Sequence, residues 1–350
     1  MRNINKLKRK IHMENLNVIG IDLAKNVFQL HGASPNGSVV FRKQLKRHEV
    51  LPFLAQRPKC TIAMEACGGC HYWAREIKTL GHEVKIIAPH FVKPFVKRQK
   101  NDRNDAEAIT EAASRKNMPL VSMKSVSVQD IQSTLRIRER CVRQRTALVN
   151  QMRGLLMEYG EIIPQGREHV LKHLPDILAN EDNKLTYYIR LEFESLMTEL
   201  LDLNERINTY EQKLDRIYTS NELCQRLAKI RGIGPITAVS VLTELDDPAV
   251  YKNGRHFAAF LGLVPRQNSS GGKAKLEGIS KQGNRHIRYL LIHGARAVLA
   301  HVDKKEDRLS CWLKELKAKH GMNKAAVALA NKNARIVWSL ARHGDSYQAS

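Results

Sequence analysis

The sequence predicts an α/β domain followed by a mostly helical remainder. Three observations lead to this fold class. Short β-rich apolar runs are concentrated between residues 17 and 89, and helical patterns of apolar residues take over from about residue 125. The length of 350 residues is enough for two or three domains. A composition of 43% hydrophobic and 27% charged residues provides for packed cores and argues against wholesale disorder.

The first part of the chain is predicted to form a mixed sheet. Strands are expected over 17–24, 27–33 and 38–45, with turn residues such as Pro35, Asn36 and Gly37 between them. The continuous apolar run "CTIAMEA", residues 60–66, is typical of a buried central strand. A helix over 72–81 and a strand over 83–89 follow it, so strands and helices alternate as in an α/β domain.

Two long helices are expected next. The helix over 127–158 is rich in arginine, and Arg136, Arg140 and Arg143 share one face. That face is either an ordinary solvated surface or a contact for nucleic acid, and the basic character of the rest of the chain favours the contact.

The second long helix has a heptad seam. Its apolar residues between 189 and 217 are spaced alternately by four and three positions, namely Ile189, Phe193, Leu196, Leu200, Leu203, Ile207, Tyr210, Leu214 and Ile217. Such a seam packs against another helix of the same chain or against a second subunit, and the spacing alone favours neither.

Residues 222–350 are predicted to form a third, mostly helical unit. It begins with "LAKIRGIGPITAVSVLTEL", in which Arg231, Gly232 and Gly234 lie between two short amphipathic helices. This is the pattern of a helix–hairpin–helix, whose backbone N–H groups bind a DNA phosphate without reading sequence.

The charge indicates a polyanionic partner. The formal net charge is +23 and the pI is about 9.9, which favours nucleic acid. Between residues 251 and 300 nine Lys and Arg residues face one acid, Glu277. A membrane is the competing polyanion, but no run reaches the roughly 20 apolar residues of a spanning helix. The basic segment 1–15 has no apolar signal-peptide core and the six cysteines have no disulfide-like spacing, so we expect a flexible arm and a cytoplasmic protein.

Four carboxylates are candidates for a metal site. Asp22 and Glu65 each end an apolar strand, and Asp102 and Asp105 share a face at the start of a helix. Together they would make an oxygen-rich site for Mg²⁺ or Mn²⁺, suited to phosphoryl transfer. By themselves Asp102 and Asp105 could simply cap their helix. The nearby "CGGCH", residues 67–71, matches a haem-attachment pattern, but the absence of an export signal and of a fourth metal ligand argues against haem or zinc.

Basic residues flank these acids and a second candidate site, the loop "RQNSSGG" at 266–272. Glycine in such a loop permits close approach of a DNA backbone, and serine supplies a hydroxyl. The candidate nucleic-acid ligands beside the acids and around the loop are Lys97, Arg98, Lys100, Arg103, Arg266, Lys273, Lys275, Lys281, Arg285 and Arg288.

These motifs resemble those of bacterial insertion-sequence transposases with a DEDD motif, the IS110 family, in its IS1111 branch. The resemblance covers nearly the whole chain and rests on "GIDLAK", "AMEACGG", "KNDRNDAEAI", "IRGIGPITA", "FAAFLGLVPRQNSSGG" and "GISKQGNRHIRYLL". It implies a RuvC-like, ribonuclease-H-type domain over 16–122, a helical coiled-coil linker over 123–220 and a C-terminal transposase domain over 221–350.

The resemblance also implies roles for individual residues. The four catalytic, metal-binding acids would be Asp22, Glu65, Asp102 and Asp105, and the catalytic serine would be Ser270, with Ser269 directly beside it. A structured RNA from the element would select donor and target DNA. The protein would form a homo-oligomer, a dimer or tetramer, in which Ser270 of one subunit meets the acids of another.

The sequence therefore predicts a DNA recombinase that moves its own insertion sequence through a covalent phosphoserine intermediate, assisted by Mg²⁺ or Mn²⁺. A metal-dependent, structure-selective nuclease that uses water as the nucleophile is the first alternative. A nucleic-acid-binding protein without enzymatic activity is the second. A covalent protein–DNA adduct distinguishes the recombinase from the nuclease.

Overall fold

The computed structural model of the chain describes residues 16–97, 102–269 and 275–344. The chain divides into two compact units, with the boundary between Ser125 and Val126.

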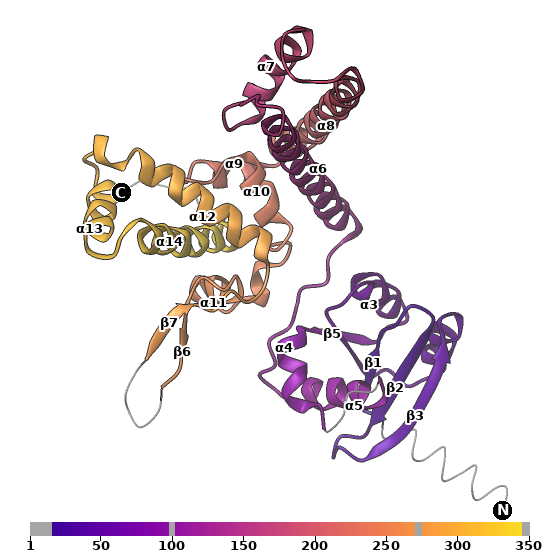
Figure 1. The fold of residues 1–350 in the computed structure, drawn as a ribbon. Helices are drawn as coiled ribbons and strands as arrows, with labels where there is room; N and C mark the ends of the chain where they lie inside the picture. The colour runs from indigo at the N-terminus through magenta and orange to yellow at the C-terminus, as the bar shows by residue number, and fades with distance from the viewer. Residues whose placement is uncertain (1–15, 98–101, 270–274, 345–350) are drawn as a thin grey trace, which may run out of the picture. The chain divides into compact units, whose positions relative to one another are not determined.

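The N-terminal unit contains a five-stranded mixed sheet, as predicted (Figure 1). The strands lie in the order β3-β2-β1-β4-β5. β1 pairs antiparallel with β2 and β2 with β3, whereas β1, β4 and β5 are parallel neighbours. The strand bounds are β1 Val18–Asp22, β2 Val27–Ala33, β3 Val39–Lys46, β4 Thr61–Glu65 and β5 Glu83–Ile87.

Helices cover both faces of this sheet. One face packs Ile19, Ile21 and Met64 against α2 and α3, and the other packs Val18 and Ala63 against α5. This division follows from the two-residue period of a strand. The bounds are α2 Val50–Ala55, α3 Cys70–Thr79, α4 Pro89–Val92 and α5 Asp102–Ala113, with 3-10 turns η1 Arg47–Glu49 and η2 Lys93–Phe95.

The second unit begins with the long helix α6, Val126–Met157, followed by α7, Arg167–Ala179, and α8, Tyr187–Ser220. The α8 seam packs on α6 of the same chain: Phe193, Leu200, Leu203 and Ile207 are buried with Leu148 and its neighbours. Arg138 pairs with Glu211, and Arg145 Nη1 donates to Asn204 Oδ1 at 2.9 Å. Because the partner's number falls as the α6 number rises, the two helices are antiparallel. Of the two alternatives for the seam, the structure shows the helical hairpin.

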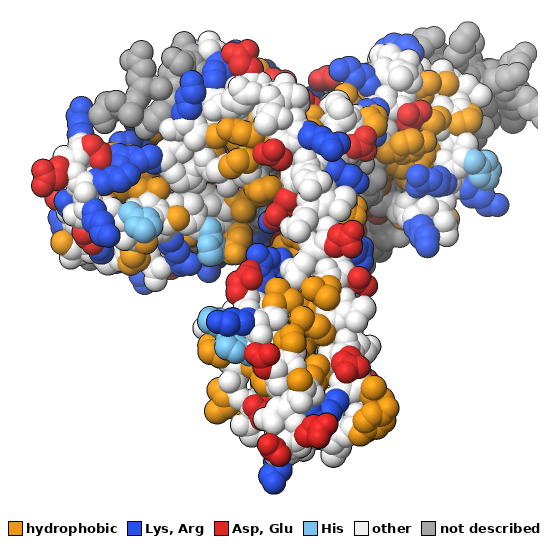
Figure 2. All heavy atoms as spheres, turned by 90° about the horizontal axis from the view of Figure 1, so that it is seen from above, with side chains coloured by type: hydrophobic (Ala, Val, Ile, Leu, Met, Phe, Trp, Pro, Cys, Tyr) orange, Lys and Arg blue, Asp and Glu red, His pale blue; other side chains and the backbone are white. Residues whose placement is uncertain are grey.

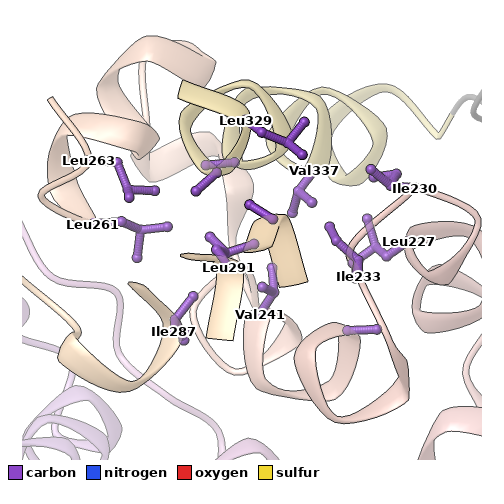
Figure 3. Packing of buried hydrophobic residues seen from close by; sticks show 14 of the residues in the cluster. Leu227, Ile230, Ile233, Val241, Leu261, Leu263, Ile287, Leu291, Leu329 and Val337 are labelled. Carbon is purple, nitrogen blue, oxygen red and sulfur yellow. The ribbon is translucent and has the colours of Figure 1, made fainter. Parts of the chain in front are cut away.

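The rest of this unit is a helical bundle with one small hairpin. Its elements are α9 Glu222–Ala228, α10 Pro235–Leu242, η3 Pro248–Val250, α11 Gly254–Phe260, β6 Pro265–Gln267, β7 Leu276–Ile279, α12 Arg285–Ala300, η4 Val302–Lys304, α13 Arg308–His320 and α14 Met322–His343. Figure 3 shows Leu227, Val241, Leu291 and Val337 directed toward one another in its core. Burial of such a cluster is the main source of stability here.

The α6–α8 region and the bundle form one unit because they share this core. Leu135 of α6 and Leu214 of α8 are buried in the same cluster as the helices α9 to α14. In the described part of this unit, β6 and β7 are the only strands. Within the resolved ranges, none of the helices combines the length and the apolar character needed to cross a membrane.

Candidate active site and nucleic-acid surfaces

Asp22 and Glu65 lie next to each other at the carboxyl ends of two adjacent parallel strands. The register pairs Ile21 with Met64, so the following residue of each strand is the acid. Both acids are half-buried. Partial burial of the Cys67 thiol raises its pKa, and with the smaller contributions of Cys70 and of the negative charges of Glu65 and Asp22 the pKa reaches about 11. The two carboxylates therefore lie within electrostatic reach of one thiol.

The helix that carries Asp105 packs directly on β1. The Gly20 N–H donates to Thr110 Oγ1 at 3.1 Å. A Cβ at Gly20 would lie 2.5 Å from the Ala106 carbonyl oxygen and closer still to Thr110 Oγ1. Only glycine allows this approach, and Ala106 directly follows Asp105. Asp105 is half-buried on the turn of α5 that lies against β1.

The acid pair suits a hard divalent cation, because carboxylate oxygens are the preferred ligands of Mg²⁺ and Mn²⁺. Asp102 begins α5, but its side chain is outside the described part of the chain. Among the side chains that the structure describes, no three His, Cys, Asp or Glu residues are grouped to hold a metal ion. The structure thus brings Asp22 and Glu65 together and leaves the four-acid site a prediction.

The loop with the predicted serine is carried by the β6–β7 hairpin, which Figure 1 shows projecting from α11. The Asn268 N–H donates to the Lys275 carbonyl oxygen at 2.9 Å. Ser269 Oγ accepts hydrogen bonds from Gln267 Nε2 at 2.9 Å and from the Lys275 N–H at 3.3 Å. The Ser269 hydroxyl therefore closes the loop. The remaining predicted loop residues, Ser270, Gly271, Gly272 and Lys273, lie outside the described residues.

The base of the hairpin is held by two glycines with positive φ. At Gly262, φ +69°, a Cβ would lie 2.5 Å from the Gln282 carbonyl oxygen, and at Gly283, φ +66°, it would collide with the Phe260 carbonyl. Lys281, φ 56°, donates its N–H to the Gly262 carbonyl oxygen at 3.2 Å. Through these contacts the stretches "FLGLVPRQ" and "SKQGN" pack against each other and form the base that carries the loop.

Arg288 belongs to this base, and its predicted role as a nucleic-acid ligand is corrected. The residue is only 7% exposed. Its guanidinium donates to the carbonyl oxygens of Leu261 at 2.9 Å and Gln282 at 2.6 Å. Burial lowers its pKa. A phosphate could reach this group only by unpacking the base, so Arg288 is structural.

The predicted phosphate-binding turn lies between α9 and α10, at residues 229–234. Gly232 has φ +88°, and a Cβ on Gly294 of α12 would collide with its carbonyl oxygen, so turn and helix are in close contact. Gly234 precedes α10 and provides no side-chain cap. The turn and α12 border a groove of about 520 Å³. The exposed N-terminal backbone of α10 is compatible with a phosphate.

Arg231, at the same turn, already has a partner inside its unit. Its Nη1 donates to Asp307 Oδ2 at 3.0 Å and to Ser310 Oγ at 3.2 Å. The guanidinium holds the Asp307 pKa well below its ordinary value. Because Asp307 also caps α13, the ion pair ties the turn to that helix, and the phosphate contact of the half-exposed Arg231 stays a prediction.

The α6 arginines divide by face. Arg136, Arg140 and Arg143 are exposed, as their shared face predicts, whereas Arg138 and Arg145 face α8. Exposure leaves the first three accessible to nucleic acid.

The other predicted ligands are mostly at the surface. Lys97 forms ion pairs with Glu107 and Glu111 at 3.5 and 3.1 Å. Exposed residues are Arg103, Arg266, Lys275, Lys281 and Arg285, whereas Arg98 and Lys100, like Lys273, lie outside the described ranges. On the face drawn in Figure 2, basic side chains are interspersed with acidic ones.

Comparison with known proteins gives matches to two protein families, one in each half of the chain. Residues 19–161 match a family of DEDD transposases of the IS110 type, and residues 224–310 match the transposase IS116/IS110/IS902 family.

Full-length relatives agree. The chain is 46% identical over 341 residues to the transposase for insertion sequence element IS1111A of Coxiella burnetii, covering 97% of this chain and 94% of that protein. It is 48% identical over 335 residues to a probable family 20 transposase of Pseudomonas aeruginosa, covering 95% and 99%. The transposase for IS1328 of Yersinia enterocolitica is 41% identical over 332 residues, covering 95% and 98%.

The family matches and the relatives together place the chain among the transposases, a class of DNA-processing enzymes. The chain belongs to the IS116/IS110/IS902 family of insertion-sequence transposases, and its high identity to the IS1111A protein supports the IS1111 branch. Family membership favours an enzyme over the binding protein without activity.

Two features of these sites have no clear signal in the sequence. The β6–β7 hairpin is exposed along nearly its whole length, so it lacks the alternation that marks a half-buried strand. The contact of Gly20 with Thr110 joins residues 90 positions apart. In the sequence, only the presence of a glycine inside an apolar strand indicates such a close approach.

Proposed function

We propose that this transposase cleaves DNA by attack of Ser270 on a phosphodiester and rejoins the strands through a covalent phosphoserine. The observation that carries the proposal is the pair of carboxylates, Asp22 and Glu65, at adjacent strand ends beside the helix of Asp105. The hydrogen bonds of Ser269 support Ser270 as the nucleophile, because the Ser269 hydroxyl is engaged in closing the loop.

The chemistry conserves the number of phosphate ester bonds. The Ser270 oxygen forms a bond to phosphorus and its proton passes to a base, while the bond from phosphorus to one deoxyribose oxygen breaks and that oxygen takes up a proton. Attack by the hydroxyl of a second DNA end reverses these steps and frees the serine. Exposed Arg266 and Lys275 beside the loop would hold the phosphate.

Asp22, Glu65, Asp102 and Asp105 would hold Mg²⁺ or Mn²⁺. The cation, when bound, polarises the phosphate and stabilises charge on the attacking and leaving oxygens. The carboxylates of this chain would hold the cation in place, and its positive charge would compensate the negative charge of the half-buried Asp22, Glu65 and Asp105.

The protein would act as a homo-oligomer with active sites shared between subunits. The acids belong to the N-terminal unit and Ser270 to the second, which is compatible with the serine of one subunit serving the acids of another. A structured RNA from the element, bound on basic surfaces such as the α6 arginines, would choose donor and target DNA.

Denaturing electrophoresis of the protein with end-labelled element DNA, its RNA and Mg²⁺ tests the serine mechanism. Ser270→Ala should eliminate both cleavage and the label that runs with the protein, and the matched Ser269→Ala variant should retain much of each. The geometric reason is that the attacking oxygen must lie about 3–3.5 Å from phosphorus, so neighbouring hydroxyls are not equivalent. Normal cleavage by Ser270→Ala would overturn the proposal.

The same assay tests the alternative, a structure-selective nuclease. In that mechanism water attacks, no adduct forms, and neither serine is needed. Asp22→Asn, Glu65→Gln and EDTA should abolish cleavage in both mechanisms, so they test the acid site independently of the serine.

A further inference from the structure

A second groove lies in the C-terminal bundle, away from the turn 229–234. Its volume is about 1060 Å³, and it is bounded by α11, the base of the β6–β7 hairpin, α13 and α14. Asn331 Nδ2 of α14 donates to the Leu263 carbonyl oxygen at 3.1 Å, and a Cβ at Gly254 of α11 would lie 2.8 Å from the Arg335 carbonyl oxygen. These close contacts fix the walls of the groove relative to one another.

The walls of this groove combine aromatic and cationic side chains. Trp312 and Trp338 are half-buried in it. Its rim carries four exposed cations, Arg255, Lys324, Lys332 and Arg335. Among the described residues that line the groove, none is acidic. The ion pairs seen within the described ranges do not use these four cations.

The two tryptophans differ in their freedom to contact a ligand. The Trp338 indole N–H donates to the Pro248 carbonyl oxygen at 3.1 Å, which fixes that ring. The Trp312 ring is contacted by Lys332, whose Nζ lies 4.9 Å from the ring centre. The flexible ammonium group of Lys332 can move from the ring to a phosphate, and a planar group such as a base can then stack on the ring.

We infer that this groove binds an unpaired segment of the DNA being processed, with a base stacked on Trp312 and its phosphates on the cationic rim. Stacking aromatics within a basic groove are the features by which proteins hold single strands without reading sequence. Pro265 and Ile279, at the base of the β6–β7 hairpin, line the groove, so the groove adjoins the hairpin that carries the loop of Ser270. The inference rests on the proposed function only for the use of that strand, not for its binding.

The test measures binding by full-length protein in EDTA, where failure of the serine mechanism has no effect. The probe is a fluorescein-labelled oligo(dT) of about 12 nucleotides, compared with a duplex and with oligo(U) of the same length. Trp312→Ala should weaken oligo(dT) binding about tenfold, Trp312→Phe should retain most of the affinity, and the duplex affinity should change less than about twofold.

Two further readouts separate a bound base from a merely structural tryptophan. Oligo(dT) should quench the intrinsic fluorescence of the wild type, and Trp312→Phe should lose most of that quenching. Lys324→Gln with Arg335→Gln should reduce the slope of log affinity against log salt by about 1.4, whereas Lys319→Gln, an exposed control on α13 outside the groove, should not. Unchanged oligo(dT) affinity in a folded Trp312→Ala protein would overturn the inference, as would dependence on Trp312 for oligo(U) alone.

Discussion

Gly20 shows how a single missing side chain determines the position of a helix. Its backbone contacts Thr110 and the Ala106 carbonyl oxygen, and Thr110 Oγ1 also donates to the His31 carbonyl oxygen at 3.1 Å. A hydroxyl of α5 therefore bonds to two strands of the sheet at once. This contact fixes α5, and with it Asp105, against the strand that ends in Asp22.

Gly20→Ala should consequently impair both stability and cleavage. The added methyl group would collide with Thr110 and push α5 off the sheet, at a cost of about 1–3 kcal/mol in the free energy of unfolding. Urea denaturation measures this cost, and the electrophoretic assay measures cleavage.

Gly278→Ala is the matched control for this substitution. A Cβ at Gly278 in β7 meets no atom within 4 Å, so its stability should stay within about 0.5 kcal/mol of the wild type. Wild-type urea stability in Gly20→Ala would show that α5 adapts and does not depend on the glycine.

The helix α8 shows how an element can be recognised correctly while its partner stays open. Its heptad seam identifies the buried residues in advance, and Leu200 and Leu203 are indeed 0% and 5% exposed. The seam packs on α6 of the same chain. Because α6 of the same chain covers this seam, the seam residues stabilise the fold of the protomer.

Leu200→Glu should therefore unfold the α6–α8 hairpin instead of yielding well-folded monomers. A carboxylate at a fully buried position without a cation costs about 3 kcal/mol or more. Limited proteolysis and circular dichroism should show early cleavage and loss of helix.

Leu201→Glu is the control for the seam, because Leu201 is 52% exposed on the next position of the same helix. It should leave both measurements unchanged. A Leu200→Glu protein that stays resistant to protease, with a halved mass by light scattering, would assign the seam to an interface between subunits.

At the scale of the whole molecule, the charge of +23 provides affinity for nucleic acid, but individual arginines differ in their use. Arg231, Arg288 and Arg138 have partners within the fold. Arg136, Arg140 and Arg143 are exposed on α6. The second group is the more exposed, although Arg143 Nε lies 3.9 Å from Glu139 Oε1, and we expect it to contribute more to counterion release through phosphate contacts.

Replacing Arg136, Arg140 and Arg143 together by Gln should therefore reduce the slope of log affinity against log salt by up to about 2.7 on duplex DNA, if each contacts one phosphate. Thermal stability should be almost unchanged. Fluorescence anisotropy over a salt series measures the slope.

Arg138→Gln should have the opposite pattern. Arg138 Nε donates to Glu211 Oε1 at 3.0 Å across the helical hairpin, so its loss should lower the melting temperature and leave the slope unchanged. Equal slopes for the triple variant and the wild type would exclude α6 from the nucleic-acid surface.

Local pattern was sufficient for most elements of this protein. The apolar run at 60–66 became β4, the helix expected over 127–158 became α6, and the 189–217 seam lies within α8. The acids at the ends of β1 and β4 could also be found, because an acid that ends an apolar strand is visible from its immediate neighbours. The family and the candidate Ser270 came from whole motifs, each continuous in the sequence.

Tertiary structure alone decided what each side chain contacts. Arg231 and Arg136 look alike in the sequence, yet the first pairs with Asp307, 76 positions away, and the second remains exposed. The groove of Trp312 is assembled from α11, the hairpin base, α13 and α14. The sequence of any one of these elements does not indicate that the groove exists. The physical reason is that periodicity records which face of an element is buried, whereas ion pairs, close backbone approaches and grooves arise between elements whose order in space the periodicity does not contain.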